Sequence, residues 1–463
     1  MKPATMKQNI IFATITTALL SCGTSHQKQS AMHLIALDPG HFHASLVQQQ
    51  MYPGIDSTIR VFTPEGPEVK QYLASIERFN QQTDPPVHWA TDVYTGHDYL
   101  EKMLQQPPGN IVVIAGNNRL KATYIRRSVH AGQHVLADKP MAIDAASFDS
   151  LQAAFQEAAD KKVQLYDIMT ERYEIRNTLQ RELALLPDVF GTLEPGSQQD
   201  PSVVKNSVHH FKKLVAGKTM VRPAWYVDET QQGEGIVDVT THLVDLVQWT
   251  CFPEQTIHYR TDIHVDSARR WATPMTLQQY SDITGQNSFP EYLHKNISKD
   301  SILQVYANGA FDYTIKGIHA NISVTWNYQA PEGTGDTHYS LLRGSLASLI
   351  IRQGAEQQYK PVLYIESTHC HDSTYTKMVE SRIAALTHKY PGLSLKKNDK
   401  GWEVVIPETL AKKHEALFGK VMQQFLEYIR NNNMPAWEVP NMLAKYYTTT
   451  QALTLAQQTA SRQ

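Results

Sequence analysis

Three side chains of types that exchange protons stand close to the ends of predicted elements: Lys139, Asp238 and His242. Lys139 follows a short apolar strand, and ligands bind at the carboxyl ends of strands in an open parallel sheet. Asp238 and His242 are four residues apart, so a helix over residues 236–249 would place them on one face. Together, a lysine, an acid and a histidine suit general acid/base chemistry on a hydroxyl group. The alternatives are a solvated loop lysine and a hydrogen bond between buried helix side chains.

The lysine is delivered by a predicted strand-helix-strand unit. Its first strand, Ile111–Ala115, is apolar and β-branched, which is typical of a strand buried on both faces of a parallel sheet. A helix over 122–130 and a strand over 134–137 follow. Two earlier runs, 33–37 and 58–62, also read as strands. The sequence therefore predicts an α/β fold that begins with a doubly wound parallel sheet.

Beyond residue 167 the strand pattern changes to one of alternating apolar and polar side chains. Ile322–Tyr328 alternates in this way, which indicates a sheet packed on one face and wet on the other. Trp326 and Tyr328 are assigned to the core rather than to a ligand site. The strands predicted in this part are 203–208, 257–266, 301–306, 314–318, 321–328, 338–342 and 347–352.

Two segments resemble one known family. Residues 134–142, with Asp138-Lys139-Pro140, resemble the Glu-Lys-Pro signature of the glucose-fructose oxidoreductase/inositol dehydrogenase (Gfo/Idh/MocA) family. Residues 222–245, with Asp238 and His242, are similar to its substrate-side segment. The resemblance covers about residues 32–355. It implies a Rossmann-type NAD(P) domain followed by an α+β domain whose large open mixed sheet forms a sugar site. It also implies that Lys139 and His242 handle the proton and that Asp238 orients them.

With this resemblance the chain divides into five predicted parts. A C-terminal extension of about a hundred residues is expected to pack on the second domain and to mark a lipoprotein subfamily. It contains helices predicted over 410–430 and 440–461. The parts are a signal peptide (1–21), a tether (22–31), the Rossmann domain (32–167), the substrate-binding domain (168–355) and the extension (356–463).

The turn after the first strand departs from the family pattern. The family's Gly-x-Gly-x-x-Gly loop lets the backbone approach the cofactor pyrophosphate at a helix N-terminus. Here the turn runs from Asp38 to His43 with one glycine, Gly40, beside His41, Phe42 and His43. The two histidines either donate to the cofactor anion or cap and pack a helix reaching residue 50. No carboxylate pair stands beside them in sequence, so no metal site is expected.

The remaining cofactor contacts are expected at further strand ends. Glu65, after the second strand, is the available partner for a ribose hydroxyl, although the usual acid position is empty. Asn117 and Asn118 fall where the family contacts the nicotinamide ribose, and Asp138 and Pro140 flank Lys139. The cofactor is expected to be NAD(H) or NADP(H), with the choice open.

Four residues are expected to contact the substrate: Arg172, Tyr173, Trp225 and Asp228. Arg172 and Tyr173 resemble the family's entry into the substrate domain, and Trp225 could present an aromatic face to a sugar ring. The alternative for Arg172 is a salt bridge at a helix start.

The N-terminal residues read as an export signal. Lys2 and Lys7 precede an apolar run over residues 10–20, which is too short to span a bilayer. The sequence Leu-Leu-Ser-Cys that ends at Cys22 resembles a bacterial lipobox. Cys22 is therefore the expected lipidation site, and the protein is expected in the envelope of a Gram-negative bacterium, facing the periplasm. That anchor is the only predicted membrane contact.

The composition gives no support for nucleic acid as a partner. The 463 residues contain 43 lysines and arginines against 45 acids, a net charge of −2, which gives no reason to expect nucleic acid. Cys251 and Cys370 are expected to be buried thiols. A cluster at His369-Cys370-His371 looks metal-like, but a strand over 364–371 would point its members to opposite faces. The sequence leaves the oligomeric state undecided, and a homo-oligomer is one of the alternatives.

The expected activity is oxidation or reduction of a ring hydroxyl or ketone of a sugar or glycoside, with a tightly held cofactor because the envelope supplies no free NAD(H). One alternative is an NAD-assisted glycosidase or keto-glycoside lyase. The other is a carbohydrate-binding lipoprotein without cofactor, which the altered glycine loop favours and the retained Lys139, Asp238 and His242 oppose.

Overall fold

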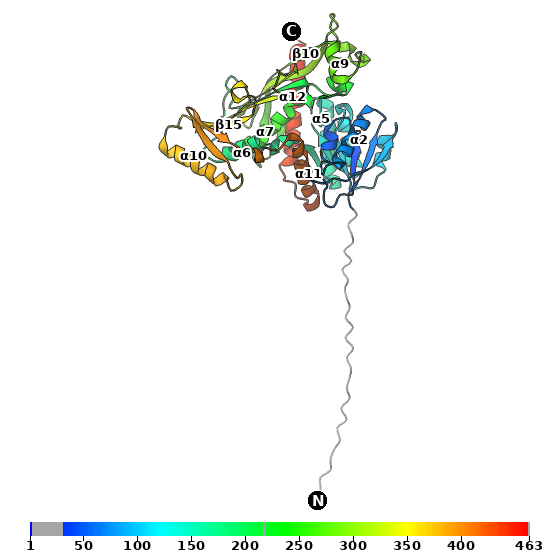
Figure 1. The fold of residues 1–463 in the computed structure, drawn as a ribbon, viewed down its shortest axis with the longest axis horizontal. Coiled ribbons are helices and arrows are strands. Elements are labelled where there is room, and N and C mark those ends of the chain that lie inside the picture. The colour runs from blue at the N-terminus through cyan, green and yellow to red at the C-terminus, as the bar shows by residue number, and fades with distance from the viewer. Residues whose placement is uncertain (2–30, 216–217, 462–463) are drawn as a thin grey trace. The chain divides into compact units, whose positions relative to one another are not determined.

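The computed structural model describes residues 1, 31–215 and 218–461, and Met32–Gln463 forms one compact unit (Figure 1). The predicted signal peptide beyond Met1, the lipidation site Cys22 and the tether up to residue 30 lie outside the described residues. Within the described part of the chain, no helix combines the length and the hydropathy needed to cross a bilayer.

The first part of the unit is a parallel sheet of six strands among the described residues, in the order β3-β2-β1-β4-β5-β6. This is the Rossmann order, with its topological switch point between β1 and β4. All residues of β1 and β4 are buried, as their apolar sequences predict. The strands are β1 (Leu34–Leu37), β2 (Thr58–Thr63), β3 (Ala90–Thr95), β4 (Ile111–Ile114), β5 (His134–Asp138) and β6 (Leu165–Ile168).

Helices connect these strands and differ from the prediction at one place. The helix after β1 ends at Leu46 and not near residue 50, because the chain turns there toward β2. β3 was not predicted, since it is an exposed edge strand without an apolar run. The elements are α1 (His43–Leu46), α2 (Pro67–Asn80), α3 (Tyr99–Leu104), η1 (Asn118–Leu120), α4 (Lys121–His130) and α5 (Ala145–Lys161).

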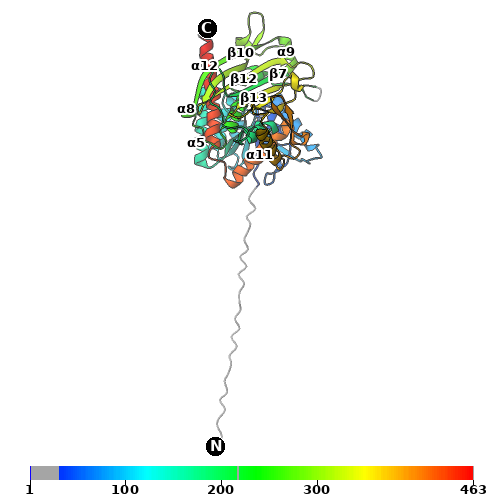
Figure 2. The same ribbon diagram turned by 90° about the vertical axis from the view of Figure 1, so that its left-hand side faces the viewer.

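The second part is a mixed sheet of nine strands among the described residues, in the order β10-β11-β12-β7-β13-β14-β15-β17-β16. Figure 2 labels β10, β12, β7 and β13 of this sheet, in which β11 lies between β10 and β12. Only the β7–β12 pair is parallel among the described pairs of this sheet. Both predicted sheets are thus confirmed. The strands are β7 (Val203–Lys212), β10 (Ile263–Met275), β11 (Leu303–Ile315), β12 (Ile318–Gln329), β13 (Thr337–Arg343), β14 (Ser348–Arg352), β15 (Val362–Glu366), β16 (Ser394–Asn398) and β17 (Gly401–Val405), with a small hairpin of β8 (Leu214–Val215) and β9 (Lys218–Thr219).

The helices of this part start later than predicted at two places. Asp238 lies in turns before the helix that carries His242, and the helix predicted from residue 410 begins at His414. The helices are α6 (Ile175–Ala184), α7 (Thr240–Cys251), α8 (Tyr259–Asp262), α9 (Leu277–Thr284), α10 (Ser373–Leu386), α11 (His414–Asn431) and α12 (Glu438–Ala460). Short 3-10 turns are η2 (Thr170–Tyr173), η3 (Ala224–Val227), η4 (Glu291–Asn296), η5 (Ala355–Gln357) and η6 (Glu408–Leu410).

The C-terminal extension does not pack on the second domain alone, which corrects the prediction. Strands β15, β16 and β17 lengthen the second sheet, but α11 buries Phe418, Met422 and Phe425 in the core of the first sheet. The helix α12 contacts α5 of the first part and both α7 and β10 of the second, and Figure 1 shows it between α5 and α7. An amphipathic helix buries its apolar face wherever apolar surface is left uncovered. Here the Rossmann sheet provides part of that surface.

The predicted strand over 364–371 is also wrong at its end. β15 stops at Glu366, and residues 367–372 form turns in which Ser367 accepts a hydrogen bond from the N–H of His369 at 3.0 Å. His369 and His371 therefore lie in an exposed turn rather than on one face of a strand.

Candidate active site

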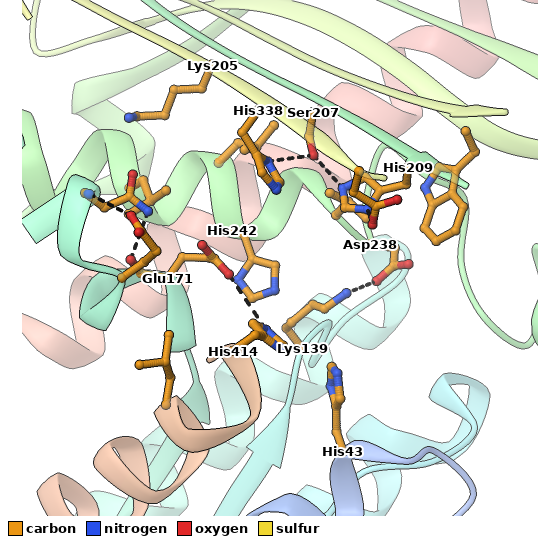
Figure 3. A pocket seen from close by; sticks show the side chains of 18 of the residues that line it. His43, Lys139, Glu171, Lys205, Ser207, His209, Asp238, His242, His338 and His414 are labelled. Carbon is orange, nitrogen blue, oxygen red and sulfur yellow. Dashed lines mark hydrogen bonds and ion pairs between the residues drawn. The ribbon is translucent and has the colours of Figure 1, made fainter. Parts of the chain in front are cut away.

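A cavity of about 570 Å³ lies between the strand ends of the first sheet and one face of the second. Figure 3 shows side chains of the second sheet directed toward Lys139 and His43 of the first part. The polar lining is dense in titratable groups: His41, His43, Asp138, Lys139, Glu171, Glu174, Arg176, Lys205, His209, Lys213, Arg222, Asp238, Asp336, His338, Lys412, His414, Glu415 and His242. The cavity is therefore the place where the predicted residues can act together.

Lys139 and Asp238 form the central contact of the cavity. Lys139 follows the last residue of β5, and its Nζ lies 2.5 Å from Asp238 Oδ1. Burial disfavours the ammonium form, but attraction by Asp238 and Asp138 outweighs it and raises the pKa of Lys139. Asp238 also accepts a hydrogen bond from Gln232 Nε2 at 3.1 Å. The structure thus brings together two residues that are 99 positions apart in sequence.

The turn that carries Asp238 depends on close backbone packing. A Cβ at Gly235 would lie 1.7 Å from the carbonyl oxygen of Ala307 on β11, so only glycine fits there. The backbone N–H of Asp238 donates to the carbonyl of Glu234 at 3.0 Å, which fixes the turn before α7. Asp238 is in this way held by the sheet and by its own turn.

His242 lies in the first turn of α7 and lines the same cavity. Burial and the nearby Lys139 hold its pKa well below the ordinary value, so the imidazole is neutral. Its Nδ1 atom is buried and has no hydrogen-bond partner within residues 31–215 and 218–461. A neutral, unpartnered imidazole beside a paired lysine can accept a proton from a bound hydroxyl.

The turn after β1 packs tightly on the loop after β4. Asp38 has a positive φ of 46°, and a Cβ at Gly116 would lie 2.2 Å from the Asp38 carbonyl oxygen. Asp38 accepts a hydrogen bond from the hydroxyl of Tyr124 at 3.0 Å, and burial raises its pKa. Of the predicted cofactor contacts in this turn, His41, Phe42 and His43 line the cavity, whereas the carboxyl group of Asp38 faces α4.

Histidines hold the carboxylate of Asp138 at the end of β5. His43 Nδ1 lies 3.0 Å and His41 Nδ1 3.6 Å from Asp138 Oδ2. Burial favours the neutral acid, but His43 and Lys121 hold the pKa of Asp138 well below its ordinary value. Pro140 is buried directly after Lys139.

The residues present fit a nicotinamide group at one end of the cavity. Asn118 lines the cavity, and its Oδ1 atom is buried without a hydrogen-bond partner in the described part of the chain. This acceptor lies at the β1–β4 switch point, where Rossmann folds bind dinucleotides. Asn117, in contrast, donates to Gln231 Oε1 at 2.8 Å, and Glu65 lies in the exposed turn after β2.

The four predicted substrate contacts do not line the cavity. Arg172 donates to both carboxylate oxygens of Asp245, at 2.7 and 2.8 Å, and is buried. It therefore belongs to the salt-bridge alternative. Tyr173 packs against the first core, and Trp225 lies 3.5 Å from the position of a Cβ at Gly40. Asp228 accepts hydrogen bonds from Thr230 and Gln231 within its own turn. Each of the four side chains therefore has its contacts outside the cavity.

The sequence reasoning missed the wall formed by β7 and β13. Ser207 Oγ lies 2.5 Å from His209 Nε2 and 3.1 Å from His338 Nδ1, and His209 Nδ1 lies 2.9 Å from Asp336 Oδ2. His209 stacks on Trp326 with ring centroids 5.0 Å apart. A signal was present, because residues 205, 207 and 209 are polar at alternate positions and must share one face of a strand. Hydroxyl and imidazole groups beside an indole ring can bind sugar hydroxyls and a ring face.

Glu171 is another residue that the prediction left out. It lines the cavity near His414, whose Nε2 atom lies 3.8 Å from Glu171 Oε1. Burial, with a smaller contribution from Glu174, raises the pKa of Glu171 to about 7. A carboxyl group with such a pKa carries its proton for part of the time at neutral pH and can act as a general acid.

Comparisons with known proteins agree with this architecture. A family model described as "Oxidoreductase family, NAD-binding Rossmann fold" matches residues 65–166, and one described as "Putative oxidoreductase C terminal domain" matches residues 179–457. The chain is similar to a protein from Parabacteroides merdae described as a "putative oxidoreductase", with 49% identity over 93% of this chain and 98% of that chain and a TM-score of 0.90. A comparison with curated proteins returns no match.

Two more distant structures share the fold. A 3-ketoreductase from Actinomadura kijaniata, solved with NADP and TDP-benzene, has 14% identity over 91% of this chain and 97% of that chain and a TM-score of 0.56. Levoglucosan dehydrogenase, solved with NADH and L-sorbose, has 11% identity over 92% and 97% and a TM-score of 0.57. The predicted family is confirmed: the chain belongs to the Gfo/Idh/MocA oxidoreductases and carries their NAD-binding Rossmann domain.

Proposed function

We propose that this protein is an NAD(P)-dependent oxidoreductase that acts on a ring hydroxyl or ketone of a sugar or glycoside. One observation carries the proposal. The Lys139–Asp238 contact and the unpartnered imidazole of His242 share one cavity with Asn118 at the dinucleotide switch point. Proton-handling groups and a cofactor position in one cavity are what oxidation of a hydroxyl requires.

The chain's own residues would divide the work of the reaction. A bound nicotinamide supplies the acceptor or donor of hydride. Lys139 is placed to hydrogen-bond the reacting oxygen and to hold or release its proton, while Asp238 fixes the ammonium group at 2.5 Å. His242 would take the proton onward, because its side chain lines the same cavity and burial keeps the imidazole pKa well below its ordinary value.

The wall opposite Lys139 supports a sugar substrate. Ser207, His209 and His338 present hydroxyl and imidazole groups to the cavity, and the ring of Trp326 supports His209 by stacking. Two proteins of the same fold are named a 3-ketoreductase and a levoglucosan dehydrogenase, and the second was solved with L-sorbose. The proposed substrate class follows from the wall and is consistent with these names.

The proposal includes a location. Cys22 would carry a lipid anchor and hold the enzyme in the bacterial envelope, facing the periplasm. In a compartment without free NAD(H), the cofactor would have to remain bound between turnovers. The proposed substrate is a sugar or glycoside that reaches this compartment, and a homo-oligomer is compatible with the proposal.

A second candidate function is NAD-assisted cleavage of a glycoside, and Glu171 favours it. A carboxyl group with a pKa of about 7 on the cavity wall could protonate a leaving glycosidic oxygen. Net cleavage without net change in nicotinamide would distinguish this function from a dehydrogenase.

The first experiment is to denature the purified protein and to identify any released nucleotide by mass spectrometry. Release of NAD(H) or NADP(H) would support a captive cofactor and would decide between the two. A panel of sugars and glycosides would then separate net oxidation from cleavage. A protein that releases no nucleotide and does not bind added NAD or NADP would refute the oxidoreductase proposal and favour a sugar-binding role.

A further inference from the structure

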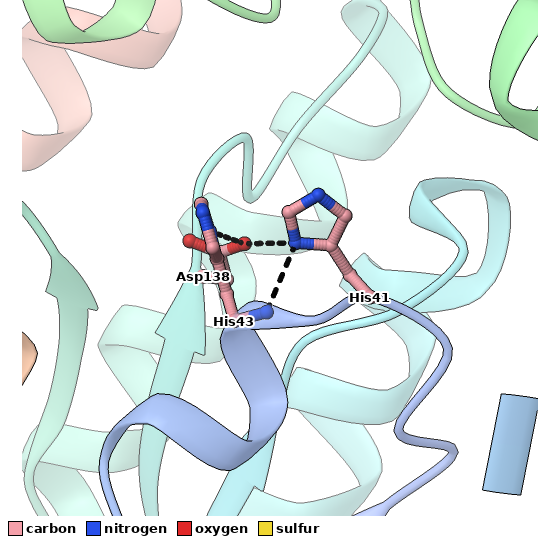
Figure 4. A group of neighbouring side chains, drawn as sticks. All are labelled: His41, His43 and Asp138. Carbon is pink, nitrogen blue, oxygen red and sulfur yellow. Dashed lines mark hydrogen bonds and ion pairs between the residues drawn. The ribbon is translucent and has the colours of Figure 1, made fainter. Parts of the chain in front are cut away.

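Two histidines and one carboxylate meet where the expected glycine loop is missing. His41 and His43 come from the turn after β1, and Asp138 ends β5 (Figure 4). The Nδ1 atoms of the histidines lie 3.6 and 3.0 Å from Asp138 Oδ2. One ligand atom from each residue lies within 4.8 Å of the other two, and this is the only such group of three or more among the described residues.

These separations suit a small metal ion. Zinc bonds to imidazole nitrogen and carboxylate oxygen are about 2.0–2.2 Å long, so two ligands of a tetrahedral ion are about 3.3–3.5 Å apart. The observed separations of 3.0 and 3.6 Å lie on either side of that range. The ligand atoms of the two histidines lie within 4.8 Å of each other, so the side chains would move closer together around a bound ion.

The local charges leave the carboxylate available. The ammonium group of Lys139 is balanced by Asp238 at 2.5 Å, and Lys121 donates to the backbone carbonyl of Asp138 rather than to its carboxylate. A bound ion would replace two existing hydrogen bonds. One joins His43 Nδ1 and Asp138, and the other is a long bond of 3.4 Å from the N–H of His43 to His41 Nδ1.

We propose that His41, His43 and Asp138 form a binding site for one divalent transition-metal ion of the Zn²⁺ class. All three residues line the cavity, so the remaining coordination position faces the substrate space. The ion would act there as a Lewis acid toward a bound oxygen atom. The site does not depend on the proposed oxidoreductase function, because its ligands are present whatever reaction the cavity performs.

The chain supplies a matched control with the same spacing. His369 and His371 are also separated by one residue, but they lie in an exposed turn. The carboxylate of Asp372, next to them, accepts from the N–H groups of Thr374 and Tyr375 at the start of α10. This second pair lacks a free carboxylate, so we expect no metal site there.

The test is titration of the chelator-treated full chain with Zn²⁺ alone by isothermal titration calorimetry, without nucleotide or sugar. We expect one ion per chain and a loss of affinity of at least about 100-fold in His43→Ala and Asp138→Asn. The double control His369→Ala/His371→Ala should bind like the wild type. Substitution with Co²⁺ gives a second readout, since its visible absorption reports the number and type of ligands.

Circular dichroism checks the fold of each variant. If His43→Ala fails to fold, His41→Asn serves instead, because His41 is partly exposed and its side chain makes only long polar contacts, 3.4 Å to the N–H of His43 and 3.6 Å to Asp138 Oδ2. Wild-type protein that binds no Zn²⁺, or binding that survives in the folded site variants, would overturn the proposal. Binding lost in the control pair instead would place the ion at the exposed turn. Because no nucleotide is present, these outcomes are independent of the mass-spectrometric test of function.

Discussion

Two lysine–aspartate contacts join the Rossmann part to the segment around α7, and they differ in what surrounds them. Lys139 at the end of β5 meets Asp238 before α7, on the wall of a cavity. Lys445 on α12 lies 2.6 Å from Asp167 of β6 and 2.7 Å from Asp245 of α7, and its side chain is 0% exposed. The chemistry of the two contacts is the same, but only the first can meet a ligand.

The comparison shows how the surroundings decide the role of an ion pair. Asp245 is also held by Arg172, which in turn binds Glu438 at 3.0 and 3.1 Å, so α7, α12 and the entry to the second domain are tied in one buried network. Burial opposes the charged form of Asp245, but Arg172 and Lys445 hold its pKa well below the ordinary value. We therefore expect the Lys445 contact to govern stability and the Lys139 contact to govern turnover.

The largest expected effect is on turnover. Lys139→Met should lower kcat/KM about 10²–10⁴-fold, because a positioned acid/base group contributes roughly that much. The loss of stability should be smaller than for Lys445→Met, since Asp238 borders the cavity and keeps its bond from Gln232. Reduction of the bound nicotinamide by an active sugar, followed by its absorbance in single turnovers at several sugar concentrations, measures the effect.

The matched control for this variant is Lys70→Met, an exposed lysine of α2. It should retain wild-type turnover. If Lys139→Met also retained full activity, the assignment of the proton-handling pair would be wrong.

The second effect is on stability. Lys445→Met leaves Asp167 and Asp245 in a buried site with one fewer counter-charge and should lower the free energy of unfolding by about 3–5 kcal/mol. Urea denaturation measures the change, and Lys161→Met on the exposed side of α5 is the control. The folded variant should keep its kcat. If the folded Lys445→Met variant lost turnover but not stability, the assignment of the Lys445 contact to stability would be wrong.

The smallest expected effect is a loss of folding stability at acidic pH, and neither ion pair causes it. His134 begins β5, its Nδ1 atom accepts a hydrogen bond from the N–H of Gln164 at 2.9 Å, and burial lowers its pKa to about 4. Between about pH 6.5 and 4 the unfolded chain binds a proton that the folded protein does not, so stability falls as the pH falls. From pH 7 to pH 5 this one histidine contributes a loss of at most about 2 kcal/mol.

His134→Asn keeps an acceptor but cannot titrate, so part of this pH dependence should disappear. Denaturation with urea at pH 7 and pH 5 measures the difference between wild type and variant. Asp245 keeps its charge well below pH 5, so the Lys445 network should persist over this range. An unchanged pH dependence in His134→Asn would assign the acid response to other groups.

Much of the fold could be predicted because buried strands and amphipathic helices leave local patterns. The apolar runs of β1 and β4 predicted buried parallel strands, and the helix predicted over 122–130 is α4. The edge strand β3 was missed because its exposed side chains carry no apolar pattern. The packing of α11 on the first sheet was also not predicted, because an amphipathic pattern does not indicate which sheet the apolar face will cover.

The sequence by itself determined the residues that could do chemistry, because their types, the position of Lys139 after a strand and the helical spacing of Asp238 and His242 are local properties. Lys139, Asp238 and His242 were identified in this way, and in the structure all three line one cavity. Only the tertiary structure decided which groups meet. In the folded chain Arg172 donates to Asp245. Ser207, His209 and Asp336 are joined by hydrogen bonds. Asp138 contacts His43, which lies 95 positions away in sequence. Such contacts depend on how the two sheets and their helices pack together, and no local sequence pattern encodes that packing.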